Sequence, residues 1–329
     1  MDPLEIQIHK MKFSLRNTLA TLFGIALIAG ILIYLDIGEF FNKIKGISLF
    51  WVLISSIIVI ISYLFRAWRL KVYSSLSTKD LFGIVIGGYS LNALLPLKIG
   101  DIAMIAMLKR YGTELKRSIN IIVHCRILDL LALALITAPL SLFYVNEELN
   151  VLSNSYLILI ITLGFLAVIY FFKIGVFTKI IQFVESKLKV SLFKRILSKG
   201  VEQAEDYSKL ITTGNIPALF HSLMSWIMDG LVAYTIALGL SENIPFALVL
   251  IAVTISNIAK VIPATPGGIG IYEGAMILFL GYFGISPLIA GTIAIVEHLL
   301  KNIITIVIGG TIMLKRGLNS ETIKEYVKN

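Results

Sequence analysis

Two apolar segments of this chain are interrupted by Pro and Gly, and they occupy corresponding places in its two halves. Each segment, 92–108 and 257–280, carries Asn, Pro, Gly and an acid in that order, with one Lys beside the break. A break in an apolar segment leaves backbone N–H and C=O groups unpaired, so inside a bilayer it survives only against protein or a wet cavity. Broken segments at matched positions of two halves are typical of a transporter's binding site.

The remainder of the chain is almost entirely apolar. Hydrophobic residues make up 57% and charged residues 15%, and the mean hydropathy is +0.89, far outside the range of soluble domains. The first apolar run, 18–35, is too long for a signal-peptide core, so we expect it to remain as a helix. The single Cys125 excludes an internal disulfide and a multi-Cys metal site.

The net charge of +9 indicates anionic lipid as the partner. The bases flank hydrophobic spans and are not interleaved with exposed aromatic residues, so nucleic acid is not expected.

The predicted fold is an all-α polytopic membrane protein with six full spans and two re-entrant helical hairpins in an inverted repeat. A span must cover about 30 Å of hydrocarbon. Counting the broken segments as full crossings instead gives eight or more helices, and the sequence leaves this alternative open. The six predicted spans are 18–35, 49–65, 119–145, 155–172, 216–240 and 287–314, and the hairpins are 81–108 and 245–284.

The protein is predicted to lie in the plasma membrane with both termini in the cytoplasm. Lys and Arg clusters, including Arg66, Arg69 and Lys71, all fall on one side if both broken segments turn back, and cytoplasmic loops carry such an excess. Segment 173–215 is predicted either to form interfacial helices on the anionic inner leaflet or to be a solvated connector. The predicted parts are a tail 1–17, a first half 18–146, a second half 155–314 and a tail 315–329.

Charged residues inside the predicted membrane segments are the candidate site. Each costs at least about 2.5–3.5 kcal/mol near the bilayer centre, so they should face inward and pair. Arg126 and Asp129 are three residues apart and Glu297 and Lys301 four apart, which permits ion pairs within a helix. Alternatively, these ion pairs only hold the helices together, and the sequence leaves this alternative open.

The two breaks carry the strongest indication of a ligand. Lys98 and Lys260 lie beside free backbone amides, and the Gly-rich stretch from Gly267 to Gly270 predicts an anion-binding nest. We expect the neighbouring acids, Asp101 and Glu273, to hold each Lys in place or to carry a coupling proton. Trp226 is expected to pack or to anchor at the interface. No spacing of metal ligands, no cofactor motif and no catalytic motif is present.

Four stretches together resemble a known family: LNALLPLKIGDIAMIAMLKRYG, VHCRILDLLAL, SWIMDGLVAY and IPATPGGIGIYEGAMILFLGYFGIS. They are similar to the flippase-like family that contains the membrane domain of lysylphosphatidylglycerol synthase/flippase proteins. Similar domains are attached to some archaeal dolichol-phosphate glycosyltransferases. The resemblance implies an integral membrane domain that translocates or presents a lipid with a polar head.

Three positions depart from the pattern of that family. Its Pro-x-Arg-x-Gly-Glu corresponds to Pro96, Lys98, Gly100 and Asp101, so a point charge replaces a bidentate guanidinium. Its Glu-Arg-x-x-Asp corresponds to Cys125, Arg126 and Asp129, so the first acid is missing. His298, beside Glu297, takes the place of an expected Arg. Nothing resembles a soluble aminoacyl-transfer or nucleotide-sugar domain, so lysine transfer by this chain alone is not expected.

We therefore expect a non-enzymatic lipid transporter for an anionic head group, phospholipid or polyprenyl phosphate, without a metal or cofactor. Lys98, Lys260 and Arg126 would bind phosphate, and the acids would position them or bind an amine or proton. A lipid-binding accessory module for a separate glycosyltransferase or aminoacyltransferase, or a small-solute transporter, is the alternative; homo-oligomerisation is left open. The predicted substrate-binding residues are Asn92, Lys98, Asp101, Arg126, Asp129, Asp229, Asn257, Lys260, Gly267, Gly268, Gly270, Glu273, Glu297 and His298.

Overall fold

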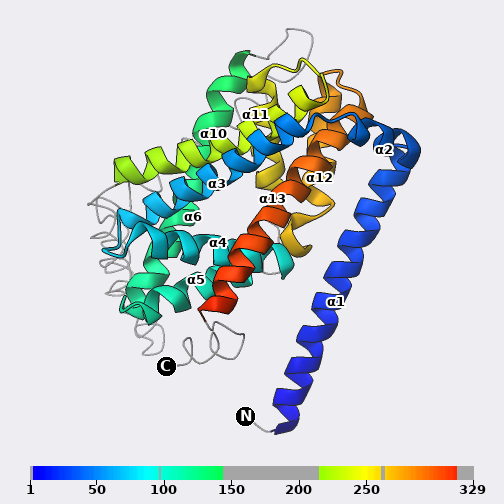
Figure 1. Ribbon diagram of the computed structural model, residues 1–329. Coiled ribbons are helices and arrows are strands. Elements are labelled where there is room, and N and C mark those ends of the chain that lie inside the picture. Colours follow the sequence, from blue (N-terminus) through cyan, green and yellow to red (C-terminus); the bar gives the residue numbers. More distant parts are fainter. Residues whose placement is uncertain (1–2, 96–97, 144–214, 261–263, 317–329) are drawn as a thin grey trace, which may run out of the picture.

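The computed structural model describes residues 3–95, 98–143, 215–260 and 264–316, and this part of the chain is helical without a strand (Figure 1). The all-α prediction is therefore confirmed for the described residues. Pro96, the predicted span 155–172, the segment 173–214 and the tail from 317 on lie outside them. The helices are α1 (Pro3–Tyr34), α2 (Ile37–Lys45), α3 (Leu49–Lys71), α4 (Thr78–Leu94), α5 (Ile99–Arg110), α6 (Leu115–Phe143), α10 (Asn215–Gly239), α11 (Phe246–Ala259), the 3₁₀ turn η1 (Pro266–Gly268), α12 (Ile271–Tyr282) and α13 (Pro287–Lys315).

Four described helices are long and apolar enough to cross a membrane: α3, α10, α13 and the Leu115–Leu140 part of α6. A fifth span results if Thr18–Tyr34 and α2, which are bent by 85° at the break between them, are taken together. Asp36 makes this bend with a φ of 65° and accepts a hydrogen bond from the Gly38 amide at 2.8 Å. Five of the six predicted spans thus coincide with these helices.

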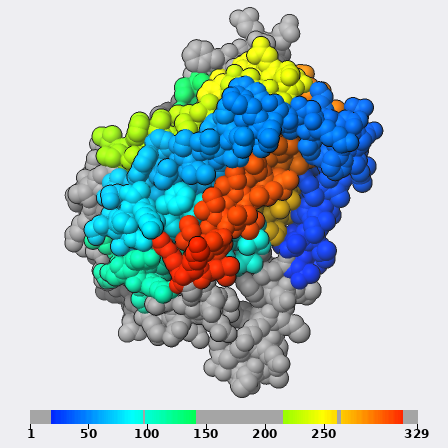
Figure 2. All heavy atoms as spheres, viewed as in Figure 1, coloured from blue at the N-terminus to red at the C-terminus, as the bar shows by residue number. Residues whose placement is uncertain are grey.

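The outward faces of the long helices are apolar. On α13, Leu299, Ile303 and Val307 recur every four residues and are 50–60% exposed, whereas Glu297 and Lys301 on the same helix are buried. Figure 2 shows α13 running across one face of the molecule beside α3. Apolar groups outside and charged groups inside are the arrangement that a bilayer requires, so the chain is a multi-pass membrane protein.

Helix contacts recur in matched sets. Exchanging α3 with α10, α4 with α11, α5 with α12 and α6 with α13 converts one set of neighbours into another. Thus α4 packs on α5 as α11 packs on α12, α5 packs on α6 as α12 packs on α13, and α4 meets α13 as α11 meets α6, while α3 and α10 pack on each other. The contacts of α3–α6 thus match those of α10–α13, and we refer to these two sets of helices as the first and the second unit.

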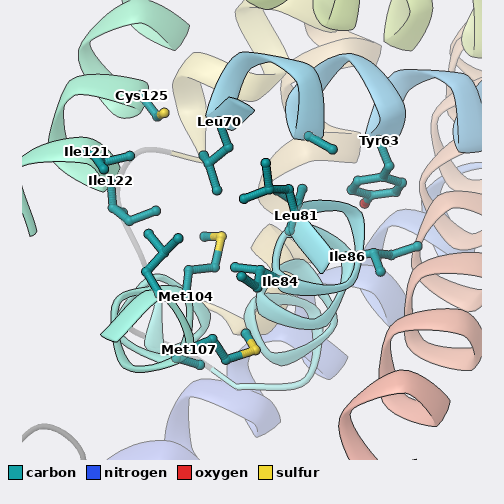
Figure 3. Close-up of a cluster of buried hydrophobic side chains, with 14 of the residues drawn as sticks. Tyr63, Leu70, Leu81, Ile84, Ile86, Met104, Met107, Ile121, Ile122 and Cys125 are labelled. Carbon is teal, nitrogen blue, oxygen red and sulfur yellow. The ribbon is translucent and has the colours of Figure 1, made fainter. Parts of the chain in front are cut away.

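The buried apolar side chains form two clusters. The first lies mainly between α3, α4, α5 and α6, where Leu70, Leu81, Ile84 and Met107 are nearly or fully buried (Figure 3), and α10 and α13 also contribute to it. The second is formed by side chains of α10 to α13 and of the α1–α2 bend, with Tyr272 and Met276 at its centre.

Both broken segments are helical hairpins whose arms pack on each other. In the first, a Cβ added to Gly100 would overlap the carbonyl oxygen of Gly88, so only Gly lets α4 and α5 come this close. Arg316 contacts both outer ends of this hairpin, because its Nη2 lies 3.2 Å from Asp80 at the start of α4 and its carbonyl accepts from Arg110 at the end of α5. The two arms therefore begin and end at the same side of the molecule.

The tips of the two hairpins touch. The 3₁₀ turn η1 of the second hairpin packs on the end of α4 in the first, where a Cβ added to Gly267 would lie 3.2 Å from the carbonyl oxygen of Ala93. Residues 96–97 and 261–263 of the two breaks lie outside the described residues. The described contact is enough to bring the polar residues of both breaks to one place.

Gly100→Ala should destabilise the protein by about 1–3 kcal/mol, because the new methyl group must push α5 away from Gly88. We expect a clearly lower midpoint of thermal unfolding in detergent micelles. Gly274→Ala, in the first turns of α12, is the matched control, since an added Cβ there meets nothing within 4 Å. Equal midpoints for the two variants would contradict the close helix contact.

Candidate functional site

A cavity of about 350 Å³ lies where the two hairpin tips meet. Its walls come from α3, α4, α5, α6, α10, α11, η1 and α13. Three predicted site residues, Gly270, Glu273 and Glu297, do not line it. Eleven others do: Asn92, Lys98, Asp101, Arg126, Asp129, Asp229, Asn257, Lys260, Gly267, Gly268 and His298.

The first break is held together by Asn92. Its side-chain oxygen accepts a hydrogen bond from the Gly100 amide at 2.8 Å, and its Nδ2 donates to Asp101 at 2.9 Å. Asn92 thereby satisfies an amide in the first turn of α5, a group that has no partner within its own helix. Lys98, the N-cap residue, adopts a left-handed conformation with φ of 53° and ψ of 40°. Such strain in a non-Gly residue is typical of functional sites.

Arg126 holds the Asp101 carboxylate in a two-pronged contact. Its Nη2 lies 2.5 Å and its Nε 2.8 Å from the two carboxylate oxygens, the fork geometry of a strong ion pair. The guanidinium also donates to the Tyr89 hydroxyl at 2.8 Å and to Asp129 at 3.2 Å. The Arg126–Asp129 ion pair predicted from their spacing is confirmed.

The second break turns on three Gly residues with positive φ: Gly267 at 61°, Gly268 at 78° and Gly270 at 84°. The Gly268 amide donates to the Thr265 carbonyl at 3.2 Å, and the Gly270 amide donates to Glu273 at 2.7 Å. Two of the three amides expected to form an anion nest are thus already used within the protein. The glycines supply the turn instead, and Gly267 and Gly268 lie in the cavity wall.

Glu273 is bound by His298, whose Nδ1 lies 2.6 Å from its Oε1. This pair repeats the Asp101–Arg126 pair, because each joins the third residue of a hairpin arm, α5 or α12, to a base 25 residues further on. The matched contacts of the two units therefore extend to their buried polar groups. Glu273 lies behind the cavity wall that His298 lines.

Two buried Arg residues of α3 were missed as site residues, and their prediction as cytoplasmic loop charges is wrong. Arg66 and Arg69 are each only 3% exposed. Arg66 pairs with Asp229 at 2.8 Å, and Arg69 pairs with Asp129. The signal was present in the sequence, because Ser55, Ser62, Arg66 and Arg69 recur at helical spacing along one face of α3.

Trp226 and Lys301 complete the walls on α10 and α13. The Trp226 indole donates to Asp129 at 3.1 Å, so this residue is more than the packing group or interface anchor expected. Lys301 lies 2.6 Å from Glu297, as predicted from their spacing, and 3.8 Å from Asp229. The Asp229 carboxylate, which also accepts from Ser62 at 2.7 Å, is thus shared by three helices.

Lys98 and Lys260 are not paired with the acids beside them, contrary to expectation. Asp101 is taken by Arg126 and Glu273 by His298, and among the described residues no carboxylate lies within 4.0 Å of either ammonium group. The Lys260 Nζ instead lies 4.4 Å from the centre of the Tyr272 ring, a cation–π contact. Both side chains nevertheless line the cavity.

The sequence of this chain matches one known protein family over most of its length. The pattern described as the lysylphosphatidylglycerol synthase TM region matches residues 21–309. The chain belongs to this family. The resemblance expected from the residues around the two breaks is thereby confirmed, because the match includes both hairpins and all the site residues above.

Three curated proteins are similar to parts or most of this chain. Glycosyltransferase AglD of Haloferax volcanii is 37% identical over 109 residues, which are 32% of this chain and 18% of AglD. UPF0104 membrane protein MJ1078 of Methanocaldococcus jannaschii is 26% identical over 68% of this chain and 92% of its own length. MJ1595 of the same organism is 22% identical over 91% and 94%, respectively. The matched part thus spans about a fifth of AglD and nearly all of the two UPF0104 proteins.

Arg66→Met should destabilise the protein by about 3–5 kcal/mol, since it removes the closer of the two basic partners of the buried Asp229 carboxylate. Lys43→Met is the matched control, because Lys43 pairs with Glu242 at 3.3 Å with a side chain 38% exposed, and such pairs contribute about 1 kcal/mol or less. The measurement is unfolding in detergent micelles.

A double variant distinguishes the ion pair from simple packing. Arg66→Met with Asp229→Leu removes both charges and should be more stable than Arg66→Met alone. A double variant no more stable than the single one would contradict the ion pair as the cause.

Proposed function

We propose that this protein is a flippase-like lipid transporter that moves or presents an anionic lipid head group, phospholipid or polyprenyl phosphate. The proposal rests chiefly on the cavity between the hairpin tips, which Lys98 and Lys260 line without a carboxylate partner among the described residues. The head group would enter this cavity while the acyl or prenyl tails stay in the bilayer. Transport in this form changes no covalent bond, so no catalytic residue is assigned.

The size of the cavity fits a head group better than a whole lipid. At about 350 Å³ it lies near the lower end of the range for ligand pockets, about 300–1,000 Å³. Polar side chains such as Asn92 and Tyr89 lie in the wall beside the charged ones, while the outward faces of the surrounding helices are apolar. This combination favours a ligand with a charged head and an apolar tail.

We further propose six spans with two re-entrant hairpins in an inverted repeat, rather than eight crossings. The arms α4, α5, α11 and α12 have 17, 12, 14 and 12 residues. At 1.5 Å per residue each is about 18–26 Å long, short of the roughly 30 Å of hydrocarbon. The contacts of Arg316 with both outer ends of the first hairpin also favour a segment that turns back. Alternating access would then exchange the conformations of the two units.

For the orientation, we propose that both termini are cytoplasmic and that the protein lies in the plasma membrane. The contacts of Arg316 with Asp80 and Arg110 place the basic ends of α5 and α13 together, whereas the Lys43–Glu242 pair joins α2 to the loop before α11. Basic residues gathered at one end favour the cytoplasmic side for that end.

Lys98→Ala and Glu273→Gln should each slow lipid movement by about tenfold or more, which corresponds to the loss of one charge-assisted contact of about 1.4 kcal/mol. The first removes a cavity cation, and the second breaks the contact that orients His298. The protein is reconstituted in vesicles, and the rate is measured at which a fluorescent phospholipid or polyprenyl phosphate becomes accessible to an impermeant quencher.

Lys43→Ala controls for the loss of one positive charge away from the cavity, and its rate should equal that of the unaltered protein. Unchanged movement in both Lys98→Ala and Glu273→Gln would overturn the assignment of this cavity as the transport site.

A second candidate function is a lipid-presenting module that serves a separate glycosyltransferase or aminoacyltransferase. The observation that favours it is the similarity to part of a chain named as a glycosyltransferase. On this proposal the purified protein alone moves no lipid in vesicles. Co-purification with such an enzyme, together with lipid-dependent stimulation of that enzyme, would support the presenting role over transport.

A further inference from the structure

We infer that the cavity prefers a head group with two negative charges, a phosphomonoester, over the singly charged phosphodiester of ordinary glycerophospholipids. This inference rests on the proposed function and specifies the substrate class of the same cavity. It follows from which charges around the cavity are already matched within the protein and which are not.

Every acid that lines the cavity has a basic partner. Asp101 is bound by Arg126, Asp129 by Arg69 and Arg126, and Asp229 by Arg66 and Lys301. Behind the wall, Glu297 lies 2.6 Å from Lys301 and Glu273 lies 2.6 Å from His298. For each of the three lining acids, the ion pair with the shortest distance is Arg126–Asp101, Arg69–Asp129 or Arg66–Asp229, respectively. No lining carboxylate is left over for the two Lys of the breaks.

Lys98 and Lys260 are therefore the two unmatched cations of the described cavity wall. They come from opposite hairpins, Lys98 as the N-cap of α5 and Lys260 as the C-cap of α11. The contact between the hairpin tips brings both breaks to one cavity, which both side chains line. The Lys260 stem lies against Gly268, where an added Cβ would overlap it. Backbone geometry rather than a carboxylate therefore positions these ammonium groups.

The unmatched charges determine which ligand suits the cavity. The face of Tyr272 attracts the Lys260 ammonium but does not neutralise its charge. A phosphomonoester carries about −1.5 to −2 charges at pH 7 and presents three free oxygens, enough to match both ammonium groups. A phosphodiester carries one charge and therefore leaves one of the two ammonium groups without a matching negative charge.

The test compares two lipids with identical acyl chains, phosphatidic acid as the monoester and phosphatidylmethanol as the diester. Each is titrated at pH 7 into phosphatidylcholine nanodiscs that hold the full chain. Trp226 lines the cavity and reports binding by its fluorescence once Trp51 and Trp68 are replaced by Phe. We expect the monoester to bind at least about tenfold more tightly, equivalent to about 1.4 kcal/mol.

Variants of the two Lys test the cause of the preference. Lys98→Gln and Lys260→Gln should each bring the ratio of the two affinities close to one, while the corresponding Arg substitutions retain it. Lys43→Gln, at the exposed pair with Glu242, should leave the ratio unchanged. Because neither Lys has a carboxylate partner among the described residues, the Gln variants should also keep the unfolding midpoint of the unaltered protein.

Equal affinities for the two lipids, or a preference that persists in both Gln variants, would overturn the inference. If both lipids are moved across vesicles at equal rates, only the preference fails and the proposed function stands. If the protein neither binds nor moves either of the two lipids, both proposals fail. Decaprenyl phosphate provides a third titration, and its affinity relative to that of phosphatidic acid identifies the preferred tail.

Discussion

Matching of charge inside an apolar shell is the constraint on which this structure depends. The outward faces of α3 and α13 are apolar, and their inward faces carry Arg66, Arg69 and Lys301. Each of these bases would be costly in hydrocarbon without a nearby carboxylate. Arg66 and Arg69 pair with acids on other helices, Asp229 on α10 and Asp129 on α6, whereas Lys301 lies near Asp229 and near Glu297 of its own helix. The ion pairs thus join several helices of the bundle, and the Arg66–Asp229 pair joins its two units. The cavity walls are therefore fixed by the same contacts that make burial of the charges tolerable.

The two units form an equivalent acid–base pair with different bases. In each, an acid at the third residue of a hairpin arm binds a base on the long helix that follows, 25 residues later. The base is Arg126 in the first unit and His298 in the second. The guanidinium contacts both carboxylate oxygens, whereas the imidazole contacts one of them through Nδ1. The equivalent positions thus keep their geometry but differ in chemistry.

Local patterns were enough to predict much of this arrangement. The Pro and Gly residues locate both breaks, and the spacings of Arg126–Asp129 and Glu297–Lys301 predict ion pairs that the structure contains. The partners of Asp101 and Glu273 could not be predicted from local spacing, because the bases that bind them lie on the next helix. These bases, and not the neighbouring Lys residues, form the ion pairs. Arg66 and Arg69 were misassigned since bases near the end of an apolar run resemble loop charges, and only their phase on α3 separates the two cases.

The contact between Gly267 and Ala93 has a consequence for how such a chain can evolve. The turning points of the two hairpins lie against each other, so an insertion that lengthens one turn displaces the other. The sequence of either turn is therefore restricted at these few positions by the shape of the other, whereas positions away from the contact are free of this restriction.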